Sequence, residues 1–262
     1  MRSKQYKRRS RAVSQTHGTG RVALVTGGAI RVGRLIVTGL AQAGYDIALH
    51  YNRSRRDADE VAAIVAGFGR ECVLVRADLG NPSAIVKMAN VVRRRFGALD
   101  VLVNSAANLQ NIPVMGVDAR RWDEVLALNT RAPHLLVREL EAELAKSRGS
   151  VLNIVDLSAV RPWPAYGVHS VSKAALAQLT RLQALALAPR VRVNALMLGD
   201  VYPSQRPRRA RAWIGRKSPL GRSVAEDDVV RAVLFSIAAE TMTGSTIVID
   251  AGARLAGPML PE

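Results

Sequence analysis

Val22-Ala23-Leu24-Val25-Thr26-Gly27-Gly28-Ala29-Ile30-Arg31-Val32-Gly33 carries the strongest structural signal in this chain of 262 residues. The four leading apolar residues predict a short buried strand, and a glycine turn follows them. Apolar residues then recur at helical spacing from position 34 to position 43. A strand, a tight glycine turn and a helix begin a doubly wound α/β domain, in which the turn points backbone N–H groups at a phosphate. Arg31 replaces the middle glycine of the common G-x-G-x-x-G pattern, so the turn alone would equally suit an ordinary strand-to-helix connection.

Strands and helices alternate along the rest of the chain. We expect further strands at 46–50, 72–75, 100–103, 151–155, 191–196 and 245–250, helices at 34–43, 57–68, 82–96 and 166–187, and one or two helices within 122–144. This alternation predicts one doubly wound, Rossmann-type α/β domain over residues 21–262, with a parallel sheet of about seven strands and helices on both faces. Ligands of such folds lie beyond the carboxyl ends of the strands, where the sequence places Arg53, Asp78, Asn104, Asp156 and Gly199.

The chain is strongly basic, with 38 Lys and Arg against 21 Asp and Glu and a formal net charge of +17. This balance points to anionic partners. Residues 1–20 form a basic arm without acidic residues, which is typical of a solvated tail, of an organelle-targeting segment or of an arm that grips RNA or another polyanion. Residues 206–217 are also rich in arginine, which suits a solvated surface, an acidic substrate carrier or a phosphate-rich polymer.

Three observations bear on the compartment and on metal chemistry. No apolar run reaches the roughly 18 to 20 residues that span a bilayer. Cys72 is the only cysteine, so no internal disulfide can form, and its apolar surroundings favour a buried structural thiol in a reducing compartment, the cytoplasm or an organelle matrix. His17, His50 and His134 show no spacing typical of metal ligands, so we expect no metal site.

The residue that selects the cofactor in a dinucleotide-binding fold follows the glycine turn by about 20 positions, and a carboxylate there takes the ribose 2′-hydroxyl. Counting 20 positions from Gly33 gives Arg53, and Ser54 follows it. A guanidinium with a neighbouring hydroxyl suits a 2′-phosphate. The sequence therefore favours NADP(H) over NAD(H).

Tyr166, His169 and Lys173 have the spacing i, i+3 and i+7, which predicts that the three side chains lie along one helix face. Asp156 precedes His169 by thirteen residues and leaves the strand that feeds this helix. A hydride-transfer enzyme needs a proton donor beside the bond that it reduces, and a cation that holds the nicotinamide ribose and lowers the pKa of the donor. We expect Lys173 to supply the cation and Tyr166 or His169 to be the donor.

From Val22 to about Arg254 the chain resembles the short-chain dehydrogenase/reductase family. Beyond the glycine turn, the matching pieces are Asp78-Leu79, Asn104-Ser105-Ala106-Ala107, Leu128-Asn129-Thr130, Ser172-Lys173-Ala174-Ala175-Leu176, Gly199 and Thr243-Gly244. Three further features are most similar to the pteridine reductase branch, which uses NADPH to reduce pterins and folates. They are Arg31, the run His50-Tyr51-Asn52-Arg53-Ser54, and Asp156 in place of the usual serine.

The resemblance also implies roles for particular residues. Those expected to bind the cofactor are Gly27, Arg31, Val32, Gly33, Asn52, Arg53, Ser54, Asp78, Leu79, Asn104, Ser105, Lys173 and Gly199. Those expected to take part in catalysis are Asn129, Asp156, Tyr166, His169 and Lys173. Members of the family usually assemble through the helices that carry Asn129 and residues 166–187. We therefore expect a homodimer or homotetramer with a small-molecule or carrier-bound substrate.

One departure from the family pattern concerns the proton donor. The catalytic tyrosine of the family stands four residues before the lysine, and His169 occupies that position here. His169 can itself be the donor, because histidine ordinarily titrates near neutral pH. Alternatively Tyr166 is the donor, since its spacing to Lys173 resembles the enoyl-thioester reductases. In a third interpretation the site is silent and the chain is a structural or nucleic-acid-associated subunit. The leading hypothesis is an NADPH-dependent reductase of a C=O, C=N or conjugated C=C bond.

Overall fold

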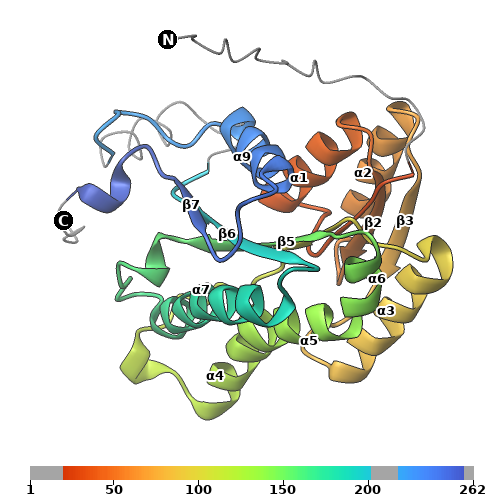
Figure 1. Ribbon diagram of the computed structural model, residues 1–262. Helices are drawn as coiled ribbons and strands as arrows, with labels where there is room; N and C mark the ends of the chain where they lie inside the picture. The colour runs from red at the N-terminus through yellow and green to blue at the C-terminus, as the bar shows by residue number, and fades with distance from the viewer. Residues whose placement is uncertain (1–19, 202–217, 257–262) are drawn as a thin grey trace, which may run out of the picture.

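The structure is a computed structural model that describes residues 20–201 and 218–256. The strands among these residues form one sheet in the order β3-β2-β1-β4-β5-β6-β7, and all neighbouring pairs are parallel (Figure 1). The predicted doubly wound α/β fold with seven parallel strands is therefore confirmed. The strands are β1 (Val22–Val25), β2 (Asp46–Tyr51), β3 (Cys72–Arg76), β4 (Val101–Asn104), β5 (Ser150–Asp156), β6 (Arg192–Leu198) and β7 (Thr246–Ile249).

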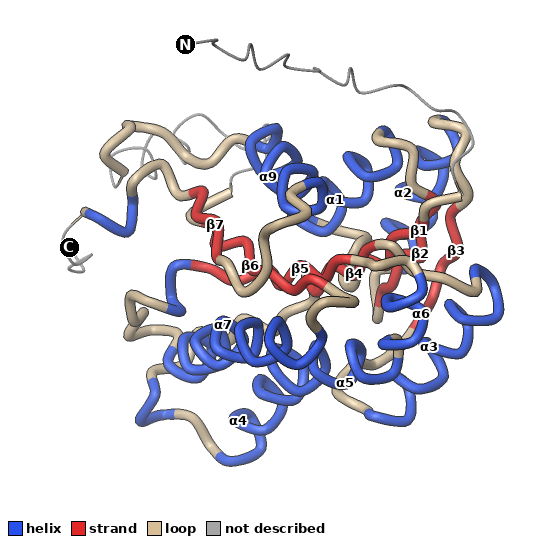
Figure 2. The backbone as a smooth tube through the Cα atoms, viewed as in Figure 1, coloured by secondary structure: helices blue, strands red, loops and turns tan. Residues whose placement is uncertain are grey.

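Helices cover both faces of the sheet (Figure 1, Figure 2). One face carries α1 (Arg31–Gln42), α2 (Arg55–Gly67) and α9 (Glu226–Ala238). The other carries α3 (Pro82–Phe96), α4 (Ala119–Leu126), α5 (Ala132–Glu139), α6 (Glu141–Lys146) and α7 (Gly167–Leu187). Crossovers between parallel strands are right-handed, so helices move to the opposite face when the chain reverses its direction along the sheet. That reversal occurs between β1 and β4.

The strand β1 shows how the sheet divides the core. Ala23 and Val25 pack in the core below α1, α2 and α9, whereas Val22 and Leu24 pack in the core on the other face. All four side chains are buried. Successive side chains of a strand point to opposite faces, so an uninterrupted apolar run is the pattern of a strand that is covered on both sides.

The starts of α1 and α3 differ in a way that matters for the site. At α3, the side chain of Asn81 accepts the N–H of Ser83 at 2.9 Å, and Pro82 occupies the first turn, where its missing N–H costs nothing. At α1, the residue before the helix is Ile30, which offers no side-chain hydrogen bond. The N–H groups of the first turn of α1 therefore lack a capping side chain.

The structure differs from the predicted helices in two places. The segment 122–144, where one or two helices were predicted, is divided into α4, the π-helical turn η2 (Ala127–Arg131), α5 and α6. Asp118 caps α4 by accepting the N–H of Arg121 at 2.8 Å, which starts the helix earlier than predicted, and Leu140 breaks the helical geometry between α5 and α6. The helix α9 was not predicted, although its acidic first turn and its buried Val229, Ala232 and Val233 follow the helical period.

Several other predictions can be placed against the structure. The basic arm predicted at 1–20, except for Gly20, and the arginine-rich stretch 206–217 lie outside the described residues. No helix of the described part is long and apolar enough to cross a membrane. Cys72 lies on β3 and is half-buried, and burial raises the pKa of its thiol to about 11, so the thiol form prevails at neutral pH.

Candidate active site

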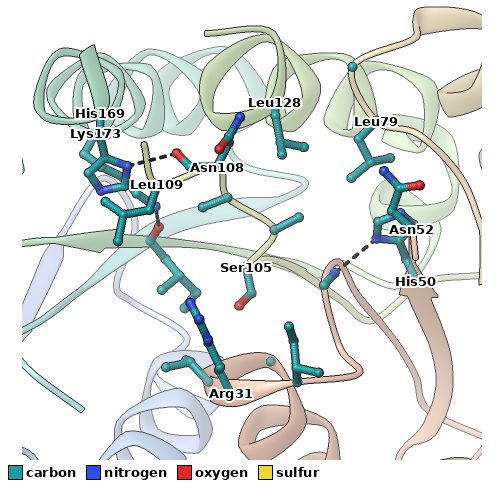
Figure 3. Close-up of a pocket in the computed structure, with 18 of the residues that line it drawn as sticks. Arg31, His50, Asn52, Leu79, Ser105, Asn108, Leu109, Leu128, His169 and Lys173 are labelled. Atoms are coloured by element: carbon teal, nitrogen blue, oxygen red, sulfur yellow. Dashed lines mark hydrogen bonds between the residues drawn. The ribbon is translucent and has the colours of Figure 1, made fainter. Parts of the chain in front are cut away.

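A cleft of about 1200 Å³ opens at the carboxyl edge of the sheet, between β1 and β4, where the strand order reverses. Its walls come mainly from the segments 27–33, 50–54, 78–81, 105–109 and 198–201, each of which follows or completes a strand. Ligands of doubly wound sheets bind at this switch point. Figure 3 shows two separate ends of the cleft, one with His169 and Lys173 and the other with His50 and Asn52.

The glycine turn packs too closely for side chains at two positions. A Cβ on Gly33 would lie 2.0 Å from the carbonyl oxygen of Gly27, and a Cβ on Gly27 would lie 3.0 Å from the Cα of Ala106. Arg31 has a φ of +51°, so the position of the missing glycine keeps a left-handed backbone although it carries a side chain. The turn and the uncapped start of α1 form a backbone cradle of the kind that binds a pyrophosphate.

The adenosine end of the cleft carries groups that suit a 2′-phosphate. Asn52, Arg53 and Ser54 line the cleft directly after β2, and no acidic residue occurs between Tyr51 and Arg56. Beyond β3, Asp78 and Leu79 line the same end, where the apolar side chain of Leu79 offers a surface for a base. The residues present therefore fit NADP(H) better than NAD(H), because an arginine with a hydroxyl replaces the carboxylate that would bind a free 2′-hydroxyl.

The structure brings together the residues predicted to bind the cofactor, with one exception. Asn104 lies deeper than the cleft, 3% exposed, and its side-chain amide donates to Oδ1 of Asn153 at 2.8 Å. The cleft is lined by Gly27, Arg31, Val32, Gly33, Asn52, Arg53, Ser54, Asp78, Leu79, Ser105, Lys173 and Gly199.

His169 lies in the first turn of α7, with its side chain 3% exposed. Its Nε2 lies 2.8 Å from Oδ2 of Asp156, and its Nδ1 lies 3.2 Å from the backbone oxygen of Asn108. Figure 3 shows His169 pointing towards Asn108 beside Lys173. The ring of Trp163 lies nearly parallel to the imidazole, at 16° and with 6.3 Å between the ring centroids. Asp156 ends β5 and its side chain is more accessible, at 22%.

Both ring nitrogens of His169 face oxygen acceptors. The amide nitrogen of Asn129 also approaches Nδ1, at 3.4 Å, but it donates to the backbone oxygen of Asn108 at 3.0 Å and to Oγ of Ser172 at 2.9 Å. Because these two bonds use both of its hydrogens, the Nδ1 of His169 is left to donate to Asn108. Each ring nitrogen of His169 therefore has an oxygen acceptor within reach, and the acceptor at Nε2 is the ionised carboxylate of Asp156.

Asp156 is held as a carboxylate by its surroundings. Its Oδ1 accepts the backbone N–H of Ser158 at 3.0 Å and also the hydroxyl of Ser158, within the turn η3 (Leu157–Ala159). Burial works to raise the pKa of Asp156, but the hydrogen bond from His169 and the charge of Lys173 outweigh it, and the pKa lies below its ordinary value. The site therefore holds a negative charge next to the proton on Nε2 of His169.

Lys173 follows His169 by one helical turn and is buried. Its Nζ donates to the backbone oxygen of Ile154 at 2.8 Å. Burial lowers the pKa of Lys173, and the charge of Asp156 opposes this effect. Asn129 reaches the site from η2, and such single π-helical turns are frequent at functional sites.

Tyr166 lies apart from the other predicted catalytic residues. It is the N-cap residue of α7, with a φ of −134°, so it stands before the helix that carries His169 and Lys173, whereas the spacing had predicted all three residues on one helix. Its ring contacts the edge of Trp163, with 6.0 Å between the centroids. Among the described residues, the set that lines the cleft includes Trp163 and His169 but not Tyr166.

Sequence reasoning assigned no role to four residues of this site. Asn108 acts through its backbone oxygen, which residue type cannot reveal. Ser158 follows Asp156 by two residues, a spacing typical of a carboxylate that accepts a nearby N–H. Trp163 and His50 line the cleft; His50 begins the run that resembles the pteridine reductase branch, and the signal for Trp163 was its position shortly before a predicted helix. No group of three or more His, Cys, Asp or Glu is placed to hold a metal ion within residues 20–201 and 218–256.

A doubly wound sheet with a side-chain-free glycine turn and a polar cleft at its switch point defines a nucleotide-binding α/β protein. The chain belongs to the short-chain dehydrogenase/reductase family and is an oxidoreductase of that family. Residues 28–254 match the family profile described as enoyl-(acyl carrier protein) reductase.

Individual relatives match almost the whole chain. Versicolorin reductase of Emericella nidulans is 29% identical over 255 residues, which are 89% of this chain and 96% of that protein. Pteridine reductase 1 of Leishmania tarentolae is 30% identical over 284 aligned positions, covering 92% of this chain and 98% of that protein. Among solved structures, FolM alternative dihydrofolate reductase 1 from Brucella canis, complexed with NADP, is 32% identical with a TM-score of 0.83, and the match covers 92% of this chain and 96% of that one.

Proposed function

We propose that this chain is an NADPH-dependent reductase of a C=N bond in a pteridine- or folate-type heterocycle, with His169 as the source of the proton. The observation that carries the proposal is the contact of 2.8 Å between Nε2 of His169 and Oδ2 of Asp156 inside the cleft. The names of two similar proteins, pteridine reductase 1 and an alternative dihydrofolate reductase complexed with NADP, support the same substrate class and cofactor.

Asp156 is the more accessible member of the His169–Asp156 pair, and its carboxylate favours a substrate with a C=N bond over one with a C=O bond. The side chain of Asp156 is 22% exposed and that of His169 is 3% exposed, so a substrate meets the carboxylate first. A carbonyl oxygen only accepts hydrogen bonds and is repelled by an ionised carboxylate. A nitrogen heterocycle presents ring or amino N–H groups that donate to Asp156, next to the ring nitrogen that takes the proton.

Reduction of C=N adds a hydride to carbon and a proton to nitrogen. NADPH, when bound, supplies the hydride and leaves as NADP⁺. His169 holds the proton at Nε2, and Asp156 passes it to the substrate nitrogen, which leaves a neutral imidazole that takes a new proton from water. Lys173, whose charge acts on Asp156 and which lines the cleft, would hold the nicotinamide ribose of the bound cofactor. The ring of Trp163 covers one face of the His169 imidazole.

Reduction of an enoyl thioester through Tyr166 has less support. Its ring packs against the edge of Trp163, and the residues that line the cleft do not include it in the described part of the chain. This chemistry is favoured by the spacing of Tyr166 to Lys173 in the sequence and by the description of the matching family profile.

The substrate class is tested with the purified full chain. Oxidation of NADPH is followed with dihydrofolate and dihydrobiopterin, with a ketone, and with an enoyl thioester. We expect turnover with the heterocycles, little with the ketone and none with the thioester. Binding of NADPH without oxidation by any of the three classes would establish the silent-site interpretation instead. Turnover of the thioester that is lost on Tyr166→Phe would establish the enoyl-reductase interpretation.

We also propose that the chain forms a homodimer or homotetramer through α7. Val171, Leu182 and Leu185 are 42%, 55% and 80% exposed on this helix, and apolar side chains that share a helix face favour association. Sedimentation of the native chain should give a dimer or tetramer, and Leu182→Lys combined with Leu185→Lys should give a monomer. A native monomer at micromolar concentration would refute this assembly.

Contact with a polyanion is a further proposal, which rests on the net charge of +17 and on the basic segments 1–20 and 206–217. Retention on heparin and binding of RNA should fall steeply with salt, because bound counterions are released. Removal of residues 1–20 should weaken both without unfolding the domain, since β1 begins at Val22. Equal retention with and without the arm would show that the arm takes no part.

A further inference from the structure

His50 is a buried side chain that the proposed chemistry does not use. It lies near the end of β2, 3% exposed, and borders the adenosine end of the cleft (Figure 3). Its Nδ1 accepts the backbone N–H of Gly27 at 3.1 Å, and its Nε2 lies 3.1 Å from the backbone oxygen of Ala77. One imidazole ring therefore joins the glycine turn after β1 to the segment after β3, across β2.

These two contacts fix the form of the ring. Because Nδ1 accepts a hydrogen bond, the ring proton resides on Nε2, which donates it to Ala77. Burial lowers the pKa of His50 to about 4, and the contact with Ala77 and the charge of Asp78 oppose this only in part. The ring is therefore neutral at physiological pH, and a second proton on Nδ1 would point directly at the N–H of Gly27.

The N–H groups of the glycine turn divide into two sets. The N–H of Gly27 is taken by the ring of His50, and the N–H of Gly28 donates to the backbone oxygen of His50 at 3.0 Å. The N–H groups at the uncapped start of α1, which includes Arg31, Val32 and Gly33, are the ones left for an anion. The histidine thus ties down one half of the turn and leaves the other half for the phosphates.

The same ring orients the segment that follows β3. Ala77, whose carbonyl accepts from Nε2, directly precedes Asp78 and Leu79, which line the adenosine end. The backbone N–H of Ala77 in turn donates to the backbone oxygen of Tyr51 at 3.1 Å. The glycine turn and the segment after β3 are therefore both held by hydrogen bonds to the side chain of His50.

We propose that His50 is a positioning residue for the dinucleotide. Its ring sets the distance between the glycine turn and the segment after β3, and it takes no part in the reaction itself. The inference rests on the NADP(H) cofactor of the proposed function. It requires that the contact with Gly27 matter more to cofactor affinity than the contact with Ala77, because Gly27 shapes the phosphate cradle itself.

Two amide variants separate the contacts. The Oδ1 of Asn occupies the place of Nδ1, so His50→Asn keeps an acceptor for Gly27 and loses the donor to Ala77. The Nε2 of Gln occupies the place of the imidazole Nε2, so His50→Gln keeps the donor and loses the acceptor. His50→Leu removes both. The dissociation constant of NADPH is measured by titration for each variant of the full chain, together with its thermal midpoint and its kcat and KM for NADPH.

We expect His50→Asn to bind NADPH within about threefold of the native chain, and His50→Gln and His50→Leu to bind it at least tenfold more weakly, with kcat at saturating NADPH nearly unchanged. If His50→Leu does not fold, the comparison of Asn with Gln still decides. Equal affinities of these two, or a tighter Gln variant, would overturn the proposal. Failure of the native chain to bind NADPH would refute both this proposal and the proposed function, whereas binding of NADPH without reduction of a heterocycle would refute the proposed function alone.

Side-chain nitrogen NMR provides a readout that a purely structural role would not move. In the native chain, the Nδ1 of His50 should show the shift of an unprotonated acceptor down to about pH 5 and should respond to NADPH. A ring that titrates near neutral pH, or that carries its proton on Nδ1, would overturn the assignment.

Discussion

Two histidines lie at the two ends of the cleft, and their rings have opposite hydrogen-bond partners. His50 is buried against the N–H of Gly27 and is neutral, whereas His169 is buried with oxygen acceptors at both ring nitrogens, the carboxylate of Asp156 and the backbone oxygen of Asn108. Both side chains are only 3% exposed. The hydrogen-bond partners of the two rings differ: an N–H donor faces Nδ1 of His50, whereas an oxygen acceptor faces each ring nitrogen of His169.

This difference separates binding from chemistry. The adenosine end needs a fixed shape, and a neutral ring with two hydrogen bonds supplies it. Such a ring places no charge that would compete with the N–H groups of α1 for the phosphates. The opposite end needs a proton that can leave, and an imidazole beside an ionised carboxylate stores one. Changes at the two histidines should accordingly affect different measurements.

The largest effect is expected at His169. His169→Ala removes the stored proton, and general acid catalysis of this kind contributes roughly a hundredfold to ten-thousandfold in rate. We expect kcat to fall by about that factor, with the dissociation constant of NADPH unchanged. Tyr166→Phe is the matched control, since its ring packs outside the cleft, and it should retain near-native turnover. A loss of NADPH affinity that parallels the loss of rate would break the proposed separation.

A second effect is the pH dependence of folding stability that the buried His50 causes. In the unfolded chain a histidine binds its proton near pH 6.5, whereas the pKa of His50 in the fold is about 4. Between these values the unfolded state binds more protons, so stability is full above the unfolded pKa and is lost as pH falls towards the folded pKa. The free energy of unfolding should decrease by about 3 kcal/mol over this window.

Urea unfolding at several pH values measures this effect. His50→Asn should remove most of the pH dependence, because an amide does not titrate. His134→Asn is the control, since His134 is exposed on α5 and its replacement should leave the dependence intact. Parallel curves for the native chain and His50→Asn would show that the ring is not held neutral.

The smallest of these effects concerns cofactor choice at Arg53. Arg53→Ala should weaken the binding of NADPH by roughly 1.5 to 3 kcal/mol, as expected for loss of one charge-assisted contact, while the affinity for NADH changes little. Isothermal titration with both cofactors gives the preference before and after the change. Equal dissociation constants of NADPH and NADH in the native chain would contradict the role given to the end of β2.

The sequence predicted most of the fold because its signals are local. Each strand is a short apolar run, and buried parallel strands have that composition whatever their neighbours. The start of α3 was predicted at Pro82, where Asn81 and Pro82 together form a cap. The sequence left open whether 122–144 holds one or two helices, and the position of the break at η2 could not be predicted, because π-helical turns are rare and occur as single turns inside α-helices.

The site was predicted less completely, since its geometry depends on contacts between distant segments. His169, Asp156 and Lys173 were found from spacing along one helix and the strand before it. The contact of His50 with Gly27 depends on the register of β1 against β2, and the contact of His169 with Asn108 depends on a loop backbone. Residue types alone do not encode such contacts. Tyr166 failed to join its predicted neighbours because α7 begins one residue after it.

The central claim is that His169 is a working proton source in a position where the family has tyrosine. The most direct test is the pH dependence of kcat/KM for the native chain and for His169→Tyr, with dihydrofolate or dihydrobiopterin as substrate. We predict that native activity falls as pH rises through neutrality, and that the variant is slower with a profile shifted towards the tyrosine range near pH 10, at unchanged NADPH affinity. A variant much faster than the native chain, or a native profile that is flat between about pH 5 and pH 8 with activity surviving His169→Ala, would contradict the claim.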